Sequence, residues 1–363
     1  MLVVCLCSLG HARLLDDRLA RRRPKARLAS PPTATVGTRF IDPFKLGKHG
    51  YGYNLSEKNG IIYTARGGHI DIAHVRKIAD WTAYLTGKVY QALKQGDTRL
   101  TYRLWEPSRY HLTLSYPSHW QQLPSGKKDK LARDMAISLG QHMAYTAATW
   151  HEMLTWFGYK GIVVWPEFQS AFTWEDNYSN LLGACVAGFA LKDQQYSYSE
   201  AVTRYLNRAL EHLGGQPRRV GRKASAAMRG VWFKGNLMFL SVYRRHFDIG
   251  DGDGQVSPWL VTCLPEVAPA RPFSLPVPDV DILADNGIRF RLEIEPRESV
   301  KDKILKAAYQ GSPTTGTRID PARHFANIMK AVRAQGIAKY GQDVEVAYWG
   351  KNKRPESFAT HTP

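Results

Sequence analysis

The clearest pattern in the chain is one long apolar stretch. Between Asp134 and Lys160 it runs for 25 residues, MAISLGQHMAYTAATWHEMLTWFGY, with a single formally charged side chain, Glu152. The stretch lacks proline, and its apolar residues cover nearly every face of a helix, which predicts a buried helix over about 129–157. A buried carboxylate without a partner costs several kcal/mol or loses its charge. Glu152 therefore needs a cation, a set of hydrogen-bond donors or a metal.

Other segments show helical or strand periodicity. A helix over about 71–93 is predicted by side chains at helical spacing, namely Ile70, His74, Ile78, Trp81 and Leu85. The segments TRLTYRLWEP and RYHLTLSYP alternate apolar and polar residues around Pro107-Ser108, which predicts a β-hairpin. Further predicted elements are a strand at 61–65, helices beginning near Trp174 and Ser197, a strand in IRFRLEIEP (288–296) and a helix at 321–340. We therefore expect an α+β fold with a buried helical core over about 70–215, a β-hairpin, and mixed strands in the C-terminal half.

Composition divides the chain into three parts. These are a signal-like segment, basic tail and linker (1–35), a single elaborated globular domain (36–350) and a tail (351–363). Within the domain we expect a helical part (about 70–215), a strand-rich part (about 218–300) and a terminal helix (about 321–340). The first residues, MLVVCLCSLGHA, have a short apolar core before a small residue, as at the end of a secretion signal. We expect export to the periplasm or cell envelope, or a cytoplasmic protein if this segment is not a signal.

Positive charge is in clear excess. The chain has 50 Lys and Arg against 32 Asp and Glu, a formal net charge of +18. Much of it falls in residues 16–27, in residues 218–223 and at Arg244-Arg245. These residues are either solvated surface or a site of attraction for a polyanion, for which an anionic cell-envelope polymer or a lipid surface is the expected partner. No specific nucleic-acid-binding motif is present, and the oligomeric state stays open.

Several familiar catalytic motifs are absent from the sequence. There is no GxSxG elbow, P-loop or dinucleotide fingerprint, so no nucleotide or flavin cofactor is expected. The cysteines show no CxxC spacing, which argues against a zinc ribbon or a disulfide framework. The chemistry must then come from histidines and acids, which occur together in three places.

The first place is GGHIDIAHVR (67–76), which contains Asp71 and His74. Their spacing puts both side chains on one helix face, and a carboxylate-x-x-His pair is how helical bundles present two ligands to one metal. The structural alternative is that Asp71 caps the helix and His74 is a hydrogen-bonded core histidine. His69, in the preceding loop, could be a third ligand or a surface residue, and we expect it at the surface.

The second place is His151 and Glu152 in the apolar helix. Adjacent helical residues point about 100° apart, so both can reach one site only at a corner between packed neighbours. The HExxH motif of zinc proteases is absent, because residue 155 is threonine. One residue could bind a metal while the other orients a ligand. The alternative is a buried salt bridge from Glu152 to Arg66 or Arg76.

The third place is WEDNYSN (174–180) at a predicted helix start. Acids there are stabilised by the helix dipole, which is sufficient reason for Glu175 and Asp176 to occur. Asp176, Ser179 and Asn180 nevertheless share a face and could complete a polar pocket. Asp176 is therefore a further candidate ligand.

Four phrases carry a resemblance to a known family. They are NGIIYTARGGHIDIAHVRKIADWTAYL (59–85), TWHEMLTWFGY (149–159), SAFTWEDNYSNLLGA (170–184) and RRHFDIGDGDGQVSPWLV (244–261). Together they resemble the bacterial family called domain of unknown function 4056. That family is largely exported, often as envelope lipoproteins, so the resemblance implies an envelope setting and no particular activity. The chain departs from the family pattern at its N-terminus, where no clean lipobox precedes a cysteine.

These observations lead to a hypothesis and an alternative. In the hypothesis the protein is a metal-dependent hydrolase acting on a cell-envelope component. Asp71, His74 and His151 hold a divalent Zn, Fe or Mn ion and Asp176 is a further metal-binding carboxylate. Glu152 is then a fourth ligand or the general base that takes a proton from metal-bound water. In the alternative, a non-catalytic envelope protein binds an anionic polymer, and its His/acid pairs are buried structural networks.

Overall fold

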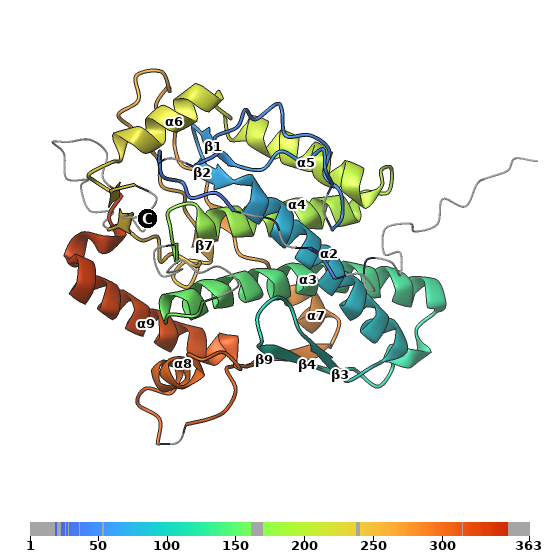
Figure 1. The fold of residues 1–363 in the computed structure, drawn as a ribbon. Helices are drawn as coiled ribbons and strands as arrows, with labels where there is room; N and C mark the ends of the chain where they lie inside the picture. The colour runs from blue at the N-terminus through green and yellow to red at the C-terminus, as the bar shows by residue number, and fades with distance from the viewer. Residues whose placement is uncertain are drawn as a thin grey trace, which may run out of the picture.

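Two long helices, α2 (Ile72–Gln95) and α3 (Ser125–Trp156), run in opposite directions across the centre of the molecule (Figure 1). The computed structural model describes residues 19, 23–25, 27, 29–35, 37–52, 54–160, 170–236, 240–313 and 315–347. The two helices touch at Gly140, where a Cβ atom would lie 2.2 Å from Thr86 Oγ1. Glycine at this position therefore lets α3 lie directly against α2.

The remaining elements form two layers on either side of this pair. One layer holds the hairpin β1 (Ile61–Thr64) and β2 (Gly68–Asp71) with helices α4 (Asp176–Lys192), α5 (Tyr198–His212) and α6 (Arg218–Ala227). The other holds strands β3 (Arg99–Tyr102), β4 (Arg109–Ser115) and β9 (Arg289–Glu295) with helices α7 (Asp281–Asp285), α8 (Lys301–Ala308) and α9 (Pro321–Tyr340). Its strands form an antiparallel sheet in the order β3-β4-β9.

The core has two main halves, and α2 contributes to both. Trp81 and Leu85 pack toward the three-stranded sheet and α3, while Val75 and Ala79 pack toward α4 and α5. Each of these side chains is at most 1% exposed. Because α2 is covered on nearly every side, the polar groups at its start are held in a fixed and largely dry environment.

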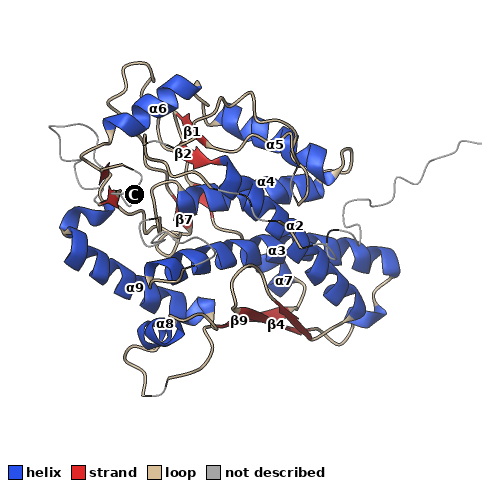
Figure 2. Ribbon diagram, viewed as in Figure 1, coloured by secondary structure: helices blue, strands red, loops and turns tan. Residues whose placement is uncertain are grey.

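The α+β prediction is confirmed, since helices dominate and strands form small antiparallel sheets (Figure 2). The predicted hairpin around Pro107-Ser108 forms as β3 and β4, and the terminal helix forms at Pro321–Tyr340. The predicted buried apolar helix forms as α3.

Residues 218–300 contain less strand than their sequence suggests. Apart from β9, the strands there are pairs of residues: β5 (Phe233–Lys234), β6 (Ser241–Val242), β7 (Gln255–Val256) and β8 (Leu275–Pro276). The segment also contains α6 and α7. Its apolar residues instead pack as an irregular cluster in which Trp232, Phe233 and Val242 surround Trp174. Burial in this cluster replaces the strand pairing that the apolar composition suggested.

The N-terminal region packs against the domain where it is described. The side chain of Arg27 is fully buried, so the interpretation of residues 16–27 as a solvated basic segment is wrong for this residue. The signal-like segment (1–12) and the tail (351–363) lie outside the described residues. None of the described helices has the length and apolar character needed to span a bilayer.

Candidate functional site

Acidic side chains from three helices meet where α2 and α4 begin and α3 ends. Asp71 is the N-cap of α2, Asp176 lies in the first turn of α4, and Glu152 lies in the last turns of α3. All three are at most 4% exposed. The N-termini of two helices carry partial positive charge, which favours carboxylates at this place. This arrangement brings Asp71 together with two acids that lie far from it in the sequence, Glu152 and Asp176.

Asp71 is held by three hydrogen bonds, two from backbone N–H groups to its carboxylate and one from its own N–H to a serine hydroxyl. Its Oδ1 accepts the N–H of Ala73 at 2.8 Å, which caps α2, and its own N–H donates to Ser179 Oγ at 3.0 Å. Its Oδ2 accepts the N–H of Ser30 at 3.2 Å. The predicted alternative role of Asp71 as a helix cap is therefore confirmed, and its second oxygen remains directed at His74.

His74 lies between two carboxylates. Its Nδ1 is 3.3 Å from Asp71 Oδ2 and 3.6 Å from Asp176 Oδ1, and 15% of the side chain is exposed. Burial lowers the pKa of His74, but the close contact with the Asp71 carboxylate and the charge of Asp176 outweigh it and raise the pKa. Nδ1 is buried and makes no well-formed hydrogen bond to the described residues. The sequence spacing thus correctly predicted that Asp71 and His74 face each other.

Asp176 has an unusually high pKa. Its Oδ2 accepts hydrogen bonds from the N–H of Thr173 at 2.8 Å and from the Thr173 hydroxyl at 2.7 Å. Burial and the charge of Glu152 nevertheless raise the pKa of Asp176 to about 7, against the opposing charge of His74. Burial and the nearby Asp176 also raise the pKa of Glu175 well above its ordinary value. The site therefore holds more carboxylates than it can keep ionised.

Among the described residues, Glu152 does not form the salt bridge that was the alternative to its role at a metal site. Its Oε2 accepts the N–H of Phe172 at 3.0 Å. Arg76 donates instead to the carbonyl of Leu46 at 2.9 Å, and Arg66 contacts His212, so neither predicted arginine is its partner. Phe172 has a left-handed φ of +54°, a conformation that costs energy for a residue with a side chain. The bond from Glu152 stabilises this strained turn just before α4.

A buried arginine close to this acid cluster was missed by the sequence reasoning. Arg245, expected at the surface, is 0% exposed and donates through Nη1 to the carbonyl of Ala171 at 2.8 Å. Burial lowers the pKa of Arg245, while Asp176 and Glu152 are close enough for their charges to oppose that effect. Sequence gave no signal for this placement, because paired arginines usually lie at the surface.

His151 points toward a different partner. Its Nδ1 lies 2.8 Å from Glu106 Oε1, in the turn between β3 and β4, and 30% of its side chain is exposed. Burial opposes ionisation of Glu106, but the hydrogen bond and charge of His151 lower its pKa overall. The structure therefore does not bring His151 into contact with Asp71, His74 or Asp176. Glu106 could not be found from sequence because only the folded hairpin brings it to α3.

Several buried acceptors near the start of α4 lack a donor. Glu175 Oε2, Asn177 Oδ1 and Asn180 Oδ1 are buried and have no hydrogen-bond partner among the described residues. The two asparagine oxygens can only accept hydrogen bonds or bind cations, and Glu175 Oε2 is limited in the same way when its carboxyl group is ionised. An unpaired buried acceptor is costly, so water or a cation is the expected partner.

His69 was expected at the surface and is instead buried. It lies in β2, 1% exposed, between the rings of Tyr63, Trp174 and Trp232. Burial lowers the pKa of His69 to about 3, so the ring is neutral. The surface prediction failed because GHID (68–71) forms a strand that pairs with β1 and not a loop.

The metal predicted from the sequence stays a prediction. Asp71, His74 and Asp176 lie together, and Glu152 is near Asp176, but His151 pairs elsewhere. Across the described ranges, no three His, Cys, Asp or Glu side chains already have an arrangement that could hold a metal ion.

The site and fold define an α+β protein whose buried histidine–carboxylate cluster joins three helices. A family model described as "Protein of unknown function (DUF4056)" matches residues 41–256, and the chain belongs to that family. The match confirms the resemblance found in the sequence and includes all of the candidate site residues. Comparison with curated proteins and with solved structures gave no match.

The metal-free protein should lose stability as the pH rises between about 4 and about 7. In the unfolded chain Asp176 ionises near pH ~4, whereas in the fold it keeps its proton until about pH 7. Between these pH values the unfolded state binds fewer protons than the folded state, so the free energy of unfolding falls by up to a few kcal/mol as the pH rises. Urea titrations at pH 5 and pH 8 with a chelator present measure this difference.

The matched control for this effect is Asp176→Asn, which cannot titrate. The variant should show a clearly smaller loss of stability between the two pH values. An equal loss in the variant and in the wild-type protein would assign the pH dependence to other groups.

Proposed function

We propose that this protein is a metal-dependent hydrolase that acts on a cell-envelope component. In this proposal Asp71, His74 and Asp176 bind a divalent cation, and Glu152 takes a proton from the attacking water. His151, part of the set predicted from the sequence, is left out because Glu106 already holds its Nδ1.

The observation that carries the proposal is the excess of buried acidic side chains around His74. Four buried acids gather there: Asp71, Glu152, Glu175 and Asp176. Burial is the main cause of the raised pKa values of Glu175 and Asp176, and repulsion adds to it, from Asp176 on Glu175 and from Glu152 on Asp176. A bound cation would relieve that repulsion and replace the protons.

The distances are compatible with a shared ion after a small rearrangement. His74 Nδ1 lies 3.3 Å from Asp71 Oδ2 and 3.6 Å from Asp176 Oδ1. Two ligand atoms bound at ~2 Å to one tetrahedral ion are about 3.3 Å apart. Since the three groups are not yet arranged as ligands, binding requires at least one carboxylate to rotate.

The metal content of the purified protein tests the ligand set. We expect the wild-type protein, after dialysis, to retain close to one equivalent of zinc or manganese. Inductively coupled plasma mass spectrometry measures this content. His74→Ala should lose most of this metal, because it removes the central ligand. His151→Ala is the matched control and should retain it. Equal metal content in all three proteins, or none in the wild type, contradicts the proposed site.

The envelope setting rests on two supports. One is the signal-like segment, and the other is the family, whose resemblance implies export. The basic surface could then bring the protein to an anionic polymer or lipid of the envelope. Fractionation of cells that produce the full chain tests this part, and recovery only in the cytoplasm contradicts it.

A non-catalytic envelope protein is the second candidate. The observation in its favour is that each acid already has a structural task. Asp71 caps α2, Asp176 accepts both donors of Thr173, and Glu152 holds the strained turn at Phe172. Under this view the acids stabilise the junction of three helices, and no variant should change metal content.

A further inference from the structure

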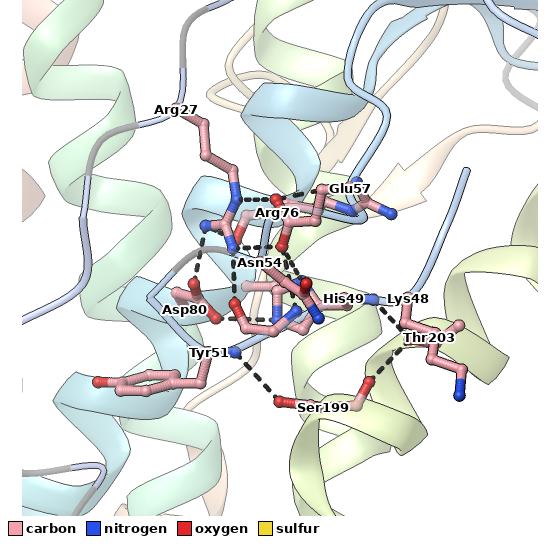
Figure 3. A network of polar contacts seen from close by, with 12 residues as sticks. Arg27, Lys48, His49, Tyr51, Asn54, Glu57, Arg76, Asp80, Ser199 and Thr203 are labelled. Carbon is pink, nitrogen blue, oxygen red and sulfur yellow. Dashed lines mark hydrogen bonds and ion pairs between the residues drawn. The ribbon is translucent and has the colours of Figure 1, made fainter.

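Arg27 reaches from the N-terminal region into a buried polar cluster beside α2 (Figure 3). Its Nε donates to Glu57 Oε2 at 2.7 Å, and its Nη2 donates to Glu57 Oε1 at 2.9 Å. Its Nη1 donates to Asp80 Oδ2 at 2.7 Å. The carbonyls of Arg76 and Gly50 accept from Nη1 and Nη2 at 3.3 and 3.0 Å. The five N–H groups of a guanidinium thus have five acceptors, with planar two-point contact to Glu57.

The two carboxylates that bind Arg27 are also held by hydrogen bonds from other groups. The N–H of Gly50 donates to Glu57 at 3.1 Å, and the N–H of Gly52 donates to Asp80 at 3.0 Å. His49 Nε2 lies 3.0 Å from the other oxygen of Asp80. The side chains of Arg27, Glu57 and Asp80 are 0% exposed. The 49–52 loop and α2 therefore form a preorganised pocket whose shape and charge match a guanidinium group.

The described residues beyond Arg27 contact the candidate site at Asp71. We call Arg27 together with residues 29–35 the strap. Within it, the N–H of Ser30 donates to Asp71 Oδ2 at 3.2 Å. Further along, α6 and the turn after it hold the strap. Ser225 Oγ of α6 donates to the carbonyl of Pro32 at 2.6 Å, and Arg229, just after the helix, donates to the carbonyl of Ala34 at 2.8 Å.

We propose that Arg27 is a positioning residue: its guanidinium docks the strap, and the docked strap fixes the Asp71 carboxylate beside His74 through the N–H of Ser30. The oxygen that accepts this bond is the one that faces His74 Nδ1. A contact of this kind orients a metal ligand without touching the metal. The docking part stands on the contacts of Arg27 alone, and only the consequence for Asp71 rests on the proposed metal function.

The pocket is selective for guanidinium over ammonium. A lysine at position 27 would bring three donors on a flexible stem and could not make the planar two-point contact with Glu57. Loss of Arg27 leaves Glu57 and Asp80 as buried acids without their main cation, so a small guanidinium compound should enter the vacated space. Chemical rescue therefore separates a true guanidinium pocket from general stabilisation by positive charge.

The experiment compares Arg27→Ala with Arg23→Ala, a control in the same region whose side chain is exposed. Limited proteolysis followed by mass spectrometry measures cleavage within the strap. We expect cleavage to be at least tenfold faster in Arg27→Ala and unchanged in Arg23→Ala. Millimolar methylguanidinium should restore protection, whereas methylammonium and Arg27→Lys should not. Full protection of the strap in Arg27→Ala, or equal rescue by methylammonium, overturns the docking role.

A second pair of variants tests the link to Asp71 even if Arg27→Ala fails to fold. Ser30→Pro removes the N–H that Asp71 accepts, whereas Ser30→Ala keeps it. Zinc affinity by competition with a chromogenic chelator should fall about tenfold or more in Ser30→Pro and stay unchanged in Ser30→Ala. Equal affinity in both variants overturns the positioning role. If the wild-type protein binds no zinc, the proposed metal function fails, while the proteolysis result still decides whether Arg27 docks the strap.

Discussion

Replacing Asp80 with asparagine should lower the free energy of unfolding by about 3–5 kcal/mol, the usual cost of removing one partner from a buried ion pair. Asp80 accepts hydrogen bonds from Arg27, His49 and Gly52 and is 0% exposed. Burial alone would raise the pKa of Asp80, but His49 and Arg27 hold it below its ordinary value, so the carboxylate is ionised at neutral pH. Urea unfolding at pH 7 measures the loss.

The loss of stability in Asp80→Asn is large because the substitution leaves buried arginines with too few acids. Without the charge of Asp80, the buried cluster contains Arg27 and Arg76 with Glu57 as the single acid. Both arginines are buried, and Arg76 already donates to the carbonyls of Leu46 and Gly47. The NH₂ group of the asparagine would also face N–H groups that donate to Asp80 in the wild-type protein, so some of these hydrogen bonds would be lost.

Asp129→Asn provides the matched control, since it makes the same chemical change in an exposed ion pair. Asp129 is paired with Lys94 at 3.0 Å, and its side chain is 29% exposed. Exposed pairs of this kind contribute about 0–1 kcal/mol, so the control should lose far less stability. A similar loss in both variants would show that the buried cluster has no special energetic role.

The sequence predicted local elements well and their contacts poorly. Periodicity was sufficient for α3 and for β3 and β4, because each depends on neighbours within a few residues. The facing of Asp71 and His74 followed from helical spacing alone. By contrast, β2 was missed, because its four residues gain strand character only by pairing with β1.

The partners of the candidate site residues depended on long-range packing. Glu152 was correctly expected to be buried, but its donor is the backbone of Phe172, in a strained turn with no sequence signature. Arg27 looked like part of a solvated basic run, and only its matching set of five acceptors shows otherwise. Side-chain type and spacing therefore located the site, while the tertiary structure decided which groups meet there.

Glu152→Gln should abolish turnover while preserving the fold and the bound metal. Glutamine keeps an oxygen that can accept the Phe172 N–H, so the turn before α4 should survive. It cannot take a proton from water, and loss of a general base lowers the rate by about 10²–10⁴-fold. The measurement is release of soluble fragments from purified cell-envelope sacculi, followed by mass spectrometry, with metal content determined on the same samples.

This variant separates the two functional candidates because they predict opposite changes. If Glu152 is the base, turnover falls and the unfolding free energy stays near the wild-type value. If Glu152 only stabilises the junction of α3 and α4, the free energy of unfolding falls instead. The neutral glutamine accepts the N–H of the strained Phe172 more weakly than the carboxylate does, and no turnover is affected. The charge of Glu152 also raises the pKa of Asp176, so its neutralisation should lower that pKa in the metal-free protein. A variant with normal turnover and unchanged metal content would remove Glu152 from the catalytic proposal and leave it as a structural acid.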